Sequence, residues 1–258
     1  AGAFLASLGV EHFMEPPFVH FVQRRLSFNL VELQPPPYPN LYQELSIHYE
    51  QRGIRLIHLW EDIFIQKTAL VHSRVRALLG ESVRVYARNT EVQRISQASL
   101  NDFLNTHHLQ GATQAKYKYG LFHKEQLVAA ASFSAGRSIV RNGKPHQSYE
   151  LIRFANASGY TVTGGLSKLL NAFTNEVQPD DIMTYADRDW SLGQSYEALG
   201  FTFVENTPPQ AFLIHPQIMV RYYPHRLPEG STGEELLAKG YFMIYNAGNK
   251  KYLSLQNN

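Results

Sequence analysis

The stretch from residue 149 to residue 203 restricts the fold of this chain more than any other part of the sequence. Short β-branched and aromatic runs alternate there with an amphipathic helical pattern and glycine-containing loops: strand Tyr149–Phe154, helix Leu166–Glu176, strand Ile182–Ala186, short helix Gly193–Leu199 and strand Phe201–Val204. Strands that alternate with helices in this way bury their apolar faces by forming a sheet covered by helices. The sequence therefore predicts an α/β or α+β fold with a mixed sheet.

The rest of the chain continues this pattern. We expect further helices at Leu41–Arg52, Ile63–Leu79 and Ser99–His107 (with Ser99 as N-cap), strands at Ile54–Leu59 and Val83–Ala87, and a hairpin formed by Tyr117–His123 and Leu127–Phe133. Phe18–Leu33 fits either a strand pair or a short helix. A second hairpin, Tyr241–Tyr245 with Lys251–Leu255, is expected near the C-terminal end.

Domain organisation is indicated by a proline-rich segment and by a change of rhythm. Residues 35–39 contain four prolines, which prevent a helix or a central strand and favour an extended connector. The regular alternation begins near Ser82. We expect a small α/β module over residues 1–81 and a larger domain over residues 82–258 that includes the C-terminal hairpin.

Composition excludes several classes of protein. The chain has 258 residues, of which 44% are hydrophobic, and a net charge of only +2, so neither disorder nor a strong field for nucleic acid is indicated. The absence of cysteine excludes disulfides, thiolate metal sites and a cysteine nucleophile. No apolar run approaches the roughly 18 residues of a membrane helix, and Ala3–Val10 is a poor signal peptide. We expect a cytoplasmic protein without membrane association.

A Gly-Gly pair opens the helix at Leu166. Backbone N–H groups at a helix N-terminus have no partner within the helix, and with the helix dipole they favour a phosphate. The candidate phosphate-binding residues are Thr163, Gly164 and Gly165, with Ser167 and Lys168 as supplementary donors. A structural turn is the alternative interpretation.

The sequence SYEALGF at residues 195–201 resembles the fourth-helix signature of GNAT (Gcn5-related) acyltransferases. The resemblance implies a GNAT-like mixed sheet, acetyl-CoA as co-substrate, and its pyrophosphate on the glycine loop. It also implies that Tyr196 protonates the departing thiolate and that Glu150 is the general base toward an amine. A packing role for Tyr196 and a salt bridge for Glu150 are the structural alternatives.

The loop departs from the family pattern at two positions. Thr161 replaces an Arg or Gln, and Leu166 stands where a second small residue is usual. We expect the leucine to crowd the phosphate approach.

A narrower resemblance covers most of the chain. RGIRLIHLWEDIFIQKTALVHSRVRALLG, YELIRFAN and KGYFMIYNAGNKKY are similar to segments of phage and mobile-element proteins in which a very-short-patch-repair-like nuclease module precedes a Mom-like GNAT module. No aspartate occurs before residue 60, whereas a Mg²⁺ nuclease needs clustered oxygen ligands. We therefore interpret residues 1–81 as a degenerate, non-cutting nuclease remnant, and we expect no metal site, including at Trp60-Glu61-Asp62.

Three more residues are candidates for the substrate site. His108 ends a helix before Leu-Gln-Gly, and in the related modules a histidine recurs there; it is a candidate proton shuttle, or a histidine stabilised by the helix dipole. Asp187 follows a strand at its C-terminal end, where ligand crevices form. Arg153 and Asp187 are candidate substrate ligands, or a structural ion pair.

Three functional hypotheses follow. The first is an acetyl-CoA-dependent N-acyltransferase with direct transfer to an unknown amine. The second is a Mom-like protein that modifies or binds DNA through scattered basic residues: Arg74, Arg76, Arg84, Arg88, Arg94, Lys116, Lys118, Arg137, Arg141 and Lys144. The third is an inactive GNAT-shaped module. The sequence is compatible with a monomer or a homodimer.

Overall fold

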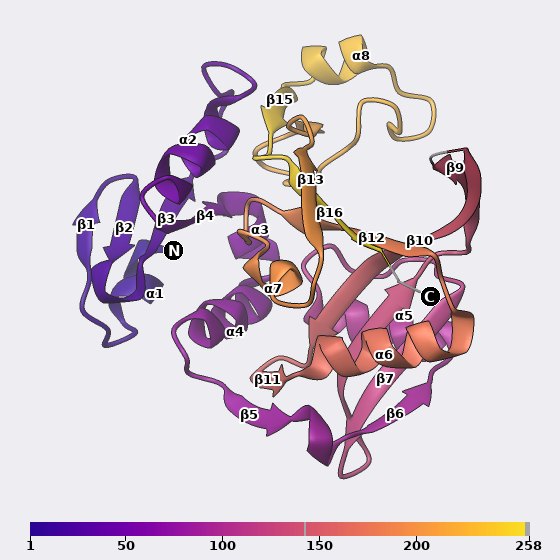
Figure 1. The fold of residues 1–258 in the computed structure, drawn as a ribbon. Coiled ribbons are helices and arrows are strands. Elements are labelled where there is room, and N and C mark those ends of the chain that lie inside the picture. Colours follow the sequence, from indigo (N-terminus) through magenta and orange to yellow (C-terminus); the bar gives the residue numbers. More distant parts are fainter. Residues whose placement is uncertain (142, 256–258) are drawn as a thin grey trace. The chain divides into compact units, whose positions relative to one another are not determined.

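The computed structural model describes residues 1–141 and 143–255 as two compact units (Figure 1). Unit 1 comprises Ala1–Gln66, Ala186–Gln194 and Glu205–Lys250, and unit 2 comprises Lys67–Tyr185, Ser195–Val204 and the chain from Lys251. Segments from the C-terminal third contribute to both units.

Unit 1 is built on a four-stranded sheet with the order β1-β2-β3-β4. Its elements are α1 (Gly2–Ala6), β1 (Phe13–Glu15), β2 (Phe18–Phe21), the 3-10 turn Val22–Arg24, β3 (Leu26–Val31), α2 (Leu41–Glu50), β4 (Arg55–Trp60), α3 (Glu61–Gln66), β14 (Ala211–Ile214), α8 (Gly233–Ala238) and β15 (Phe242–Tyr245). Strands β3 and β4 pair in parallel, which requires a crossover, and α2 lies in that connection. Strands β2 and β3 pair in the antiparallel sense, so the segment Phe18–Leu33 forms a strand pair and not a short helix.

The core of unit 1 joins segments that are far apart in the sequence. Tyr42 and Trp60 pack in one buried cluster with Phe212 of β14 and Ile244 of β15. Strands β14 and β15 pair with each other and form a separate two-stranded sheet.

Unit 2 carries the larger sheet, in the order β13-β16-β12-β10-β8-β7-β6, with β9 paired to β10. Its elements are α4 (Thr68–Leu78), β5 (Val83–Tyr86), the 3-10 turn Ala87–Asn89, β6 (Glu91–Arg94), α5 (Gln97–His107), β7 (Tyr117–His123), β8 (Gln126–Phe133), β9 (Arg137–Arg141), β10 (Lys144–Asn156), β11 (Tyr160–Thr163), α6 (Gly165–Val177), β12 (Asp181–Asp187), α7 (Gln194–Glu197), β13 (Thr202–Asn206) and β16 (Asn249–Leu255). The sheet mixes parallel and antiparallel pairs, so the predicted mixed α/β fold class is confirmed.

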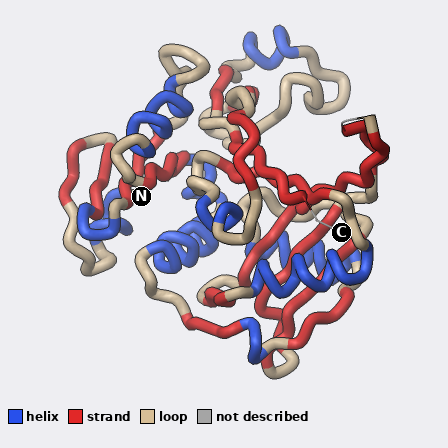
Figure 2. The backbone as a smooth tube through the Cα atoms, in the orientation of Figure 1, coloured by secondary structure: helices blue, strands red, loops and turns tan. Residues whose placement is uncertain are grey.

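Helices α5 and α6 cover opposite faces of this sheet. Side chains on a strand alternate between its two faces, and on β8 they serve different helices. Ala130 packs in a buried cluster with Leu104 of α5, whereas the ring of Phe133 stacks on Phe173 of α6 with centroids 4.0 Å apart. Figure 2 shows α6 lying across the strands on the nearer face.

Three expectations about local structure are wrong. The segment Ile63–Leu79 is broken at Lys67 into α3 and α4. The N-cap of α5 is Ser96, whose hydroxyl accepts a 3.0 Å hydrogen bond from the Ser99 amide. The C-terminal strands do not form a hairpin, because β15 pairs with β14 while β16 lies between β12 and β13.

Candidate functional site

Strands β10 and β12 separate partway along their length. Their parallel pairing runs from Ser148 and Asp181 to Leu151 and Thr184, and among the described residues it ends there, although both strands continue. The Thr184 hydroxyl donates a 3.0 Å hydrogen bond to the carbonyl oxygen of Leu151 at this point. Backbone groups beyond the last paired residues are therefore available to an extended ligand between the two strands.

Tyr196 lies at this opening. The Thr184 side chain is close enough to influence the pKa of the Tyr196 phenol. Its backbone carbonyl accepts 3.0 Å hydrogen bonds from the amides of Leu199 and Phe201, which holds α7 in a tight turn. Burial raises the pKa of the Tyr196 phenol, and the positive charges of Arg74 and Arg153 oppose this effect in part. The phenol is therefore protonated at neutral pH and can act as a proton donor.

Glu150 lies on β10 just before the opening. Its backbone is fixed by Ser134, whose hydroxyl accepts from the Glu150 amide at 2.9 Å and whose amide donates to the Glu150 carbonyl at 2.9 Å. Burial raises the pKa of the carboxyl, and the nearby charges of Arg137 and Arg153 oppose that shift. The result is a carboxylate that is more basic than an exposed glutamate.

His108 is held neutral at the end of α5. Its Nδ1 accepts a 3.1 Å hydrogen bond from the Gln110 amide, which leaves the ring proton on Nε2. Burial, followed by the positive charges of Arg153, Arg74 and Lys67, lowers its pKa to about 3. At neutral pH the ring therefore offers an Nε2–H donor and is a poor proton acceptor.

Arg153 is the common neighbour of these three groups. Its charge acts on Glu150, His108 and Tyr196. The structure thus brings together four predicted site residues that come from β10, α5 and α7.

Three residues of this cluster were not among the predicted site residues: Lys67, Arg74 and Thr184. Lys67 is the N-cap of α4, and Arg74 lies seven positions further along the same helix. A helical projection therefore places both residues on one face. Arg74 stood only among the scattered basic residues. Nothing in the sequence alone distinguishes Thr184 from other strand threonines.

The N-terminus of α6 forms a second part of the site. Gly164 is the N-cap and has a φ of +76°, a conformation that a side chain disfavours. The first hydrogen bond within the helix runs from the Lys168 amide to the Gly164 carbonyl (3.0 Å), so the amides of Gly165, Leu166 and Ser167 have no partner inside the helix. Thr163 is exposed and ends β11, opposite Tyr86 in the pairing with β5.

Two side chains of this loop are placed differently from the expectation. Leu166 is only 8% exposed and packs into the core, so it does not crowd the helix terminus. Lys168 donates its Nζ hydrogens to the carbonyl oxygens of Ala87 and Thr90, which tethers the segment between β5 and β6.

Asp187 belongs to unit 1. Its carboxylate accepts a 3.0 Å hydrogen bond from the Asp189 amide, and its carbonyl accepts from Trp190 and Ser191. These contacts shape the turn after β12. We therefore treat Asp187 separately from the cluster around Arg153.

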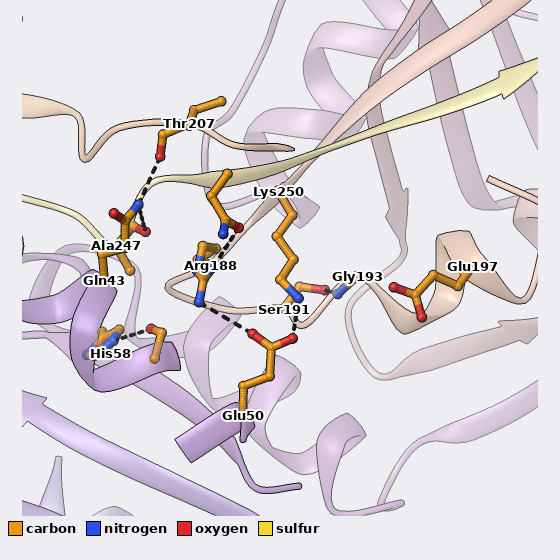
Figure 3. Close-up of polar contacts among 12 residues, drawn as sticks. Gln43, Glu50, His58, Arg188, Ser191, Gly193, Glu197, Thr207, Ala247 and Lys250 are labelled. Carbon is orange, nitrogen blue, oxygen red and sulfur yellow. Dashed lines mark hydrogen bonds and ion pairs between the residues drawn. The ribbon is translucent and has the colours of Figure 1, made fainter. Parts of the chain in front are cut away.

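Unit 1 has a buried polar network of its own. Figure 3 shows Glu50 between Arg188 and Lys250, both of which contact its carboxylate, and Arg188 also donates to Asn206 at 2.6 Å. Asp189 accepts from the Trp60 indole at 3.0 Å and from the Ala247 amide at 2.8 Å. The charged groups of this network are thus bound by protein groups.

His58, also in unit 1, is fully buried between two polar side chains. The Asn29 amide nitrogen lies 3.1 Å from its Nδ1, and the Ser46 hydroxyl lies 2.9 Å from its Nε2. Burial lowers the pKa of His58 to about 3. The ring therefore contributes to the core as a neutral group.

Asp62, from the segment Trp60-Glu61-Asp62, is bound by Arg221 through two hydrogen bonds of 2.6 and 2.8 Å. Within residues 1–141 and 143–255, no group of three or more histidine and acidic side chains is arranged to hold a metal ion. In the same part of the chain, no helix has the length and hydropathy needed to cross a membrane.

Comparison with known proteins gives only remote likenesses. No family model matches the sequence, and no curated protein matches it. Among solved structures, an acetyltransferase of Corynebacterium glutamicum described as related to a histone acetyltransferase is 14% identical, with a TM-score of 0.40 over 66% of this chain and 98% of its own. A Bacillus subtilis acetyltransferase in complex with CoA is 12% identical, with a TM-score of 0.38 over 65% of this chain and 99% of its own.

A GNAT family acetyltransferase from Elizabethkingia anophelis with acetyl-CoA bound is 10% identical. Its TM-score is 0.36, over 65% of this chain and 99% of its own. At these values the function has to be argued from the site of this chain.

Proposed function

We propose that unit 2 is an acetyl-CoA-dependent N-acyltransferase of the GNAT type, which transfers the acyl group directly to an amine. The observation that carries this proposal is the position of Tyr196, whose buried phenol is close to Thr184, the last residue of β12 paired with β10. A thioester held between the two strands would have its sulfur beside this phenol.

The cofactor would use two features of unit 2. The amides at the start of α6 would bind the pyrophosphate, because they are unpaired within the helix and point out of its positive end. The pantetheine arm would pair with the strand edges beyond Leu151 and Thr184. The Ile152 carbonyl already accepts from Arg153 Nη1 at 2.8 Å, so this arm would pair with other backbone groups.

The chemistry requires one base and one acid. Glu150, with a raised pKa, would take the proton from the ammonium form of the acceptor. The neutral amine then attacks the thioester carbonyl, and the carbon–sulfur bond breaks as the tetrahedral intermediate collapses. Tyr196 would donate its proton to the departing thiolate, and the acylated nitrogen would lose its extra proton to the tyrosinate, so that free CoA, the neutral amide and the phenol result.

The first test is binding of acetyl-CoA, measured by calorimetry, followed by a screen of amines for CoA release. Because the chain contains no cysteine, a thiol-reactive chromophore reports only the released CoA. Micromolar binding together with amine-dependent thiol release would support the proposal. Absence of acetyl-CoA binding by the wild-type protein would refute it and leave an inactive module.

A further inference from the structure

Positively charged side chains from α4 and β10 lie in the same part of unit 2. Lys67 donates its Nζ hydrogens to the carbonyl of Leu109, the residue that follows His108. Arg153 donates to the carbonyl of Ile152 at 2.8 Å, the first residue of β10 beyond its pairing with β12. Arg74 follows Lys67 by two helical turns on α4, and its side chain is partly buried.

The charges that act on His108 and Tyr196 are all positive. The charges that act on His108 are those of Arg153, Arg74 and Lys67, and the charges that act on Tyr196 are those of Arg74 and Arg153. These groups are partly buried, and charges interact more strongly in a buried site than at an exposed surface. A cationic molecule such as a polyamine is disfavoured in this field, whereas an anion is favoured.

We propose that the acceptor is an anionic amine, a molecule that carries a phosphate or a carboxylate close to its amino group, and that Arg74, Arg153 and Lys67 bind this anion beside Tyr196. The inference rests on the proposed function, since it names the substrate class of the same site. Guanidinium groups suit it because they bind phosphate and carboxylate oxygens through paired hydrogen bonds. The anion also brings the amine toward Glu150, on which Arg153 acts as well.

Anion binding is tested without turnover. Inorganic phosphate and acetate are titrated into protein labelled at histidine, and the His108 ring signals, assigned with a His108→Gln variant, are followed by NMR. We expect saturable shifts in the wild type and a loss of affinity of about tenfold or more in Arg74→Gln and Arg153→Gln. If Arg74→Gln does not fold, Arg74→Lys is measured instead. It keeps the positive charge and should still bind the anion. Arg76→Gln, exposed on the same helix, is the control and should bind as the wild type does.

Substrate selection is tested with matched acceptors at saturating acetyl-CoA. An amino acid is compared with its amide, and an aminoalkyl phosphate with the corresponding amino alcohol, which separates carboxylate from phosphate as the preferred anion. A preference of about tenfold or more in kcat/KM for one anionic member, lost in Arg74→Gln but not in Arg76→Gln, is the expected result.

Two outcomes overturn the inference and are distinct from failure of the proposed function. Equal or better use of the neutral members would overturn it, and so would His108 signals that do not respond to either anion while acetyl-CoA still binds. If acetyl-CoA itself does not bind, the proposed function fails first.

Discussion

The hydroxyl of Thr184 donates a 3.0 Å hydrogen bond to the carbonyl of Leu151, and the same side chain influences the pKa of Tyr196. One threonine therefore lies both at the point where β10 and β12 separate and close to the Tyr196 phenol. A substitution at Thr184 is expected to disturb both features together.

Replacing Tyr196 by Phe removes the proposed proton donor but keeps the ring contacts with Phe201 and Tyr252. We expect kcat to fall by roughly 10²-fold, with little change in the dissociation constant for acetyl-CoA. Steady-state kinetics and calorimetry measure the two quantities. Tyr223→Phe, at an exposed tyrosine of unit 1, is the control. An unchanged kcat in Tyr196→Phe would exclude the phenol as the acid.

Replacing Gly164 by Asp places a carboxylate at the N-cap of α6, where the pyrophosphate is proposed to bind. We expect acetyl-CoA affinity to fall by about tenfold or more, measured by calorimetry, because like charges repel at short range. Gly159→Asp is a matched control, since Gly159 also has a positive φ (82°) and open space around it. An equal loss in both variants would point to backbone strain instead of phosphate binding.

The pH profile of kcat/KM tests Glu150. A base whose pKa is raised by burial loses activity on the acid side at a higher pH than an ordinary glutamate would. Glu150→Gln should lower kcat/KM and abolish that acid limb. A limb that persists in this variant would assign the titration to another group.

Two ion pairs test how burial changes the contribution of an ion pair to the free energy of unfolding. Asp62 is 1% exposed in its pair with Arg221, whereas Glu176 is 45% exposed in its pair with Arg94. Asp62→Asn should therefore lower the free energy of unfolding by about 3 kcal/mol, and Glu176→Gln by at most about 1 kcal/mol. Urea denaturation measures both. Similar losses would mean that the Asp62–Arg221 pair is hydrated in solution.

His58 predicts how stability depends on pH. Its pKa is lowered from 6.5 in the unfolded chain to about 3 in the fold, so the unfolded state binds more protons between these values. The associated stability is complete above pH 6.5 and is lost as the pH falls toward 3, by at most about 1.4 kcal/mol per pH unit. His58→Gln should reduce this slope in urea titrations at several pH values. An unchanged slope would show that His58 is protonated in the fold.

Helices and strands whose residues show a clear local pattern were predicted correctly. The hairpin of β7 and β8, the helix α6 and the strand β12 follow from periodicity and turn residues within each segment. Glu150, Arg153, His108 and Tyr196 were named as four separate candidates, three of them through resemblances to known proteins, and their roles stay predictions. The sequence did not predict that the positive charges of Lys67 and Arg74 act on His108, because both residues come from a helix that was assigned to the other module.

Pairing between strands that are far apart in the sequence explains why the predicted C-terminal hairpin was wrong. The segments Phe242–Tyr245 and Lys251–Leu255 have the alternation and the Asn-Ala-Gly-Asn connection of a hairpin, yet each pairs with a strand remote from it in sequence. Alternation shows which residues face a core, but it does not select the partner strand.

The insertion of β16 between β12 and β13 has a consequence for synthesis of the protein. A nascent chain that has emerged from the ribosome only as far as residue 248 holds both flanking strands but not the strand that joins them. The exposed edges of β12 and β13 must wait for residues 249–255, an interval during which chaperones or wrong strand pairings compete for them. Completion of the sheet therefore waits until residues 249–255 have been synthesised.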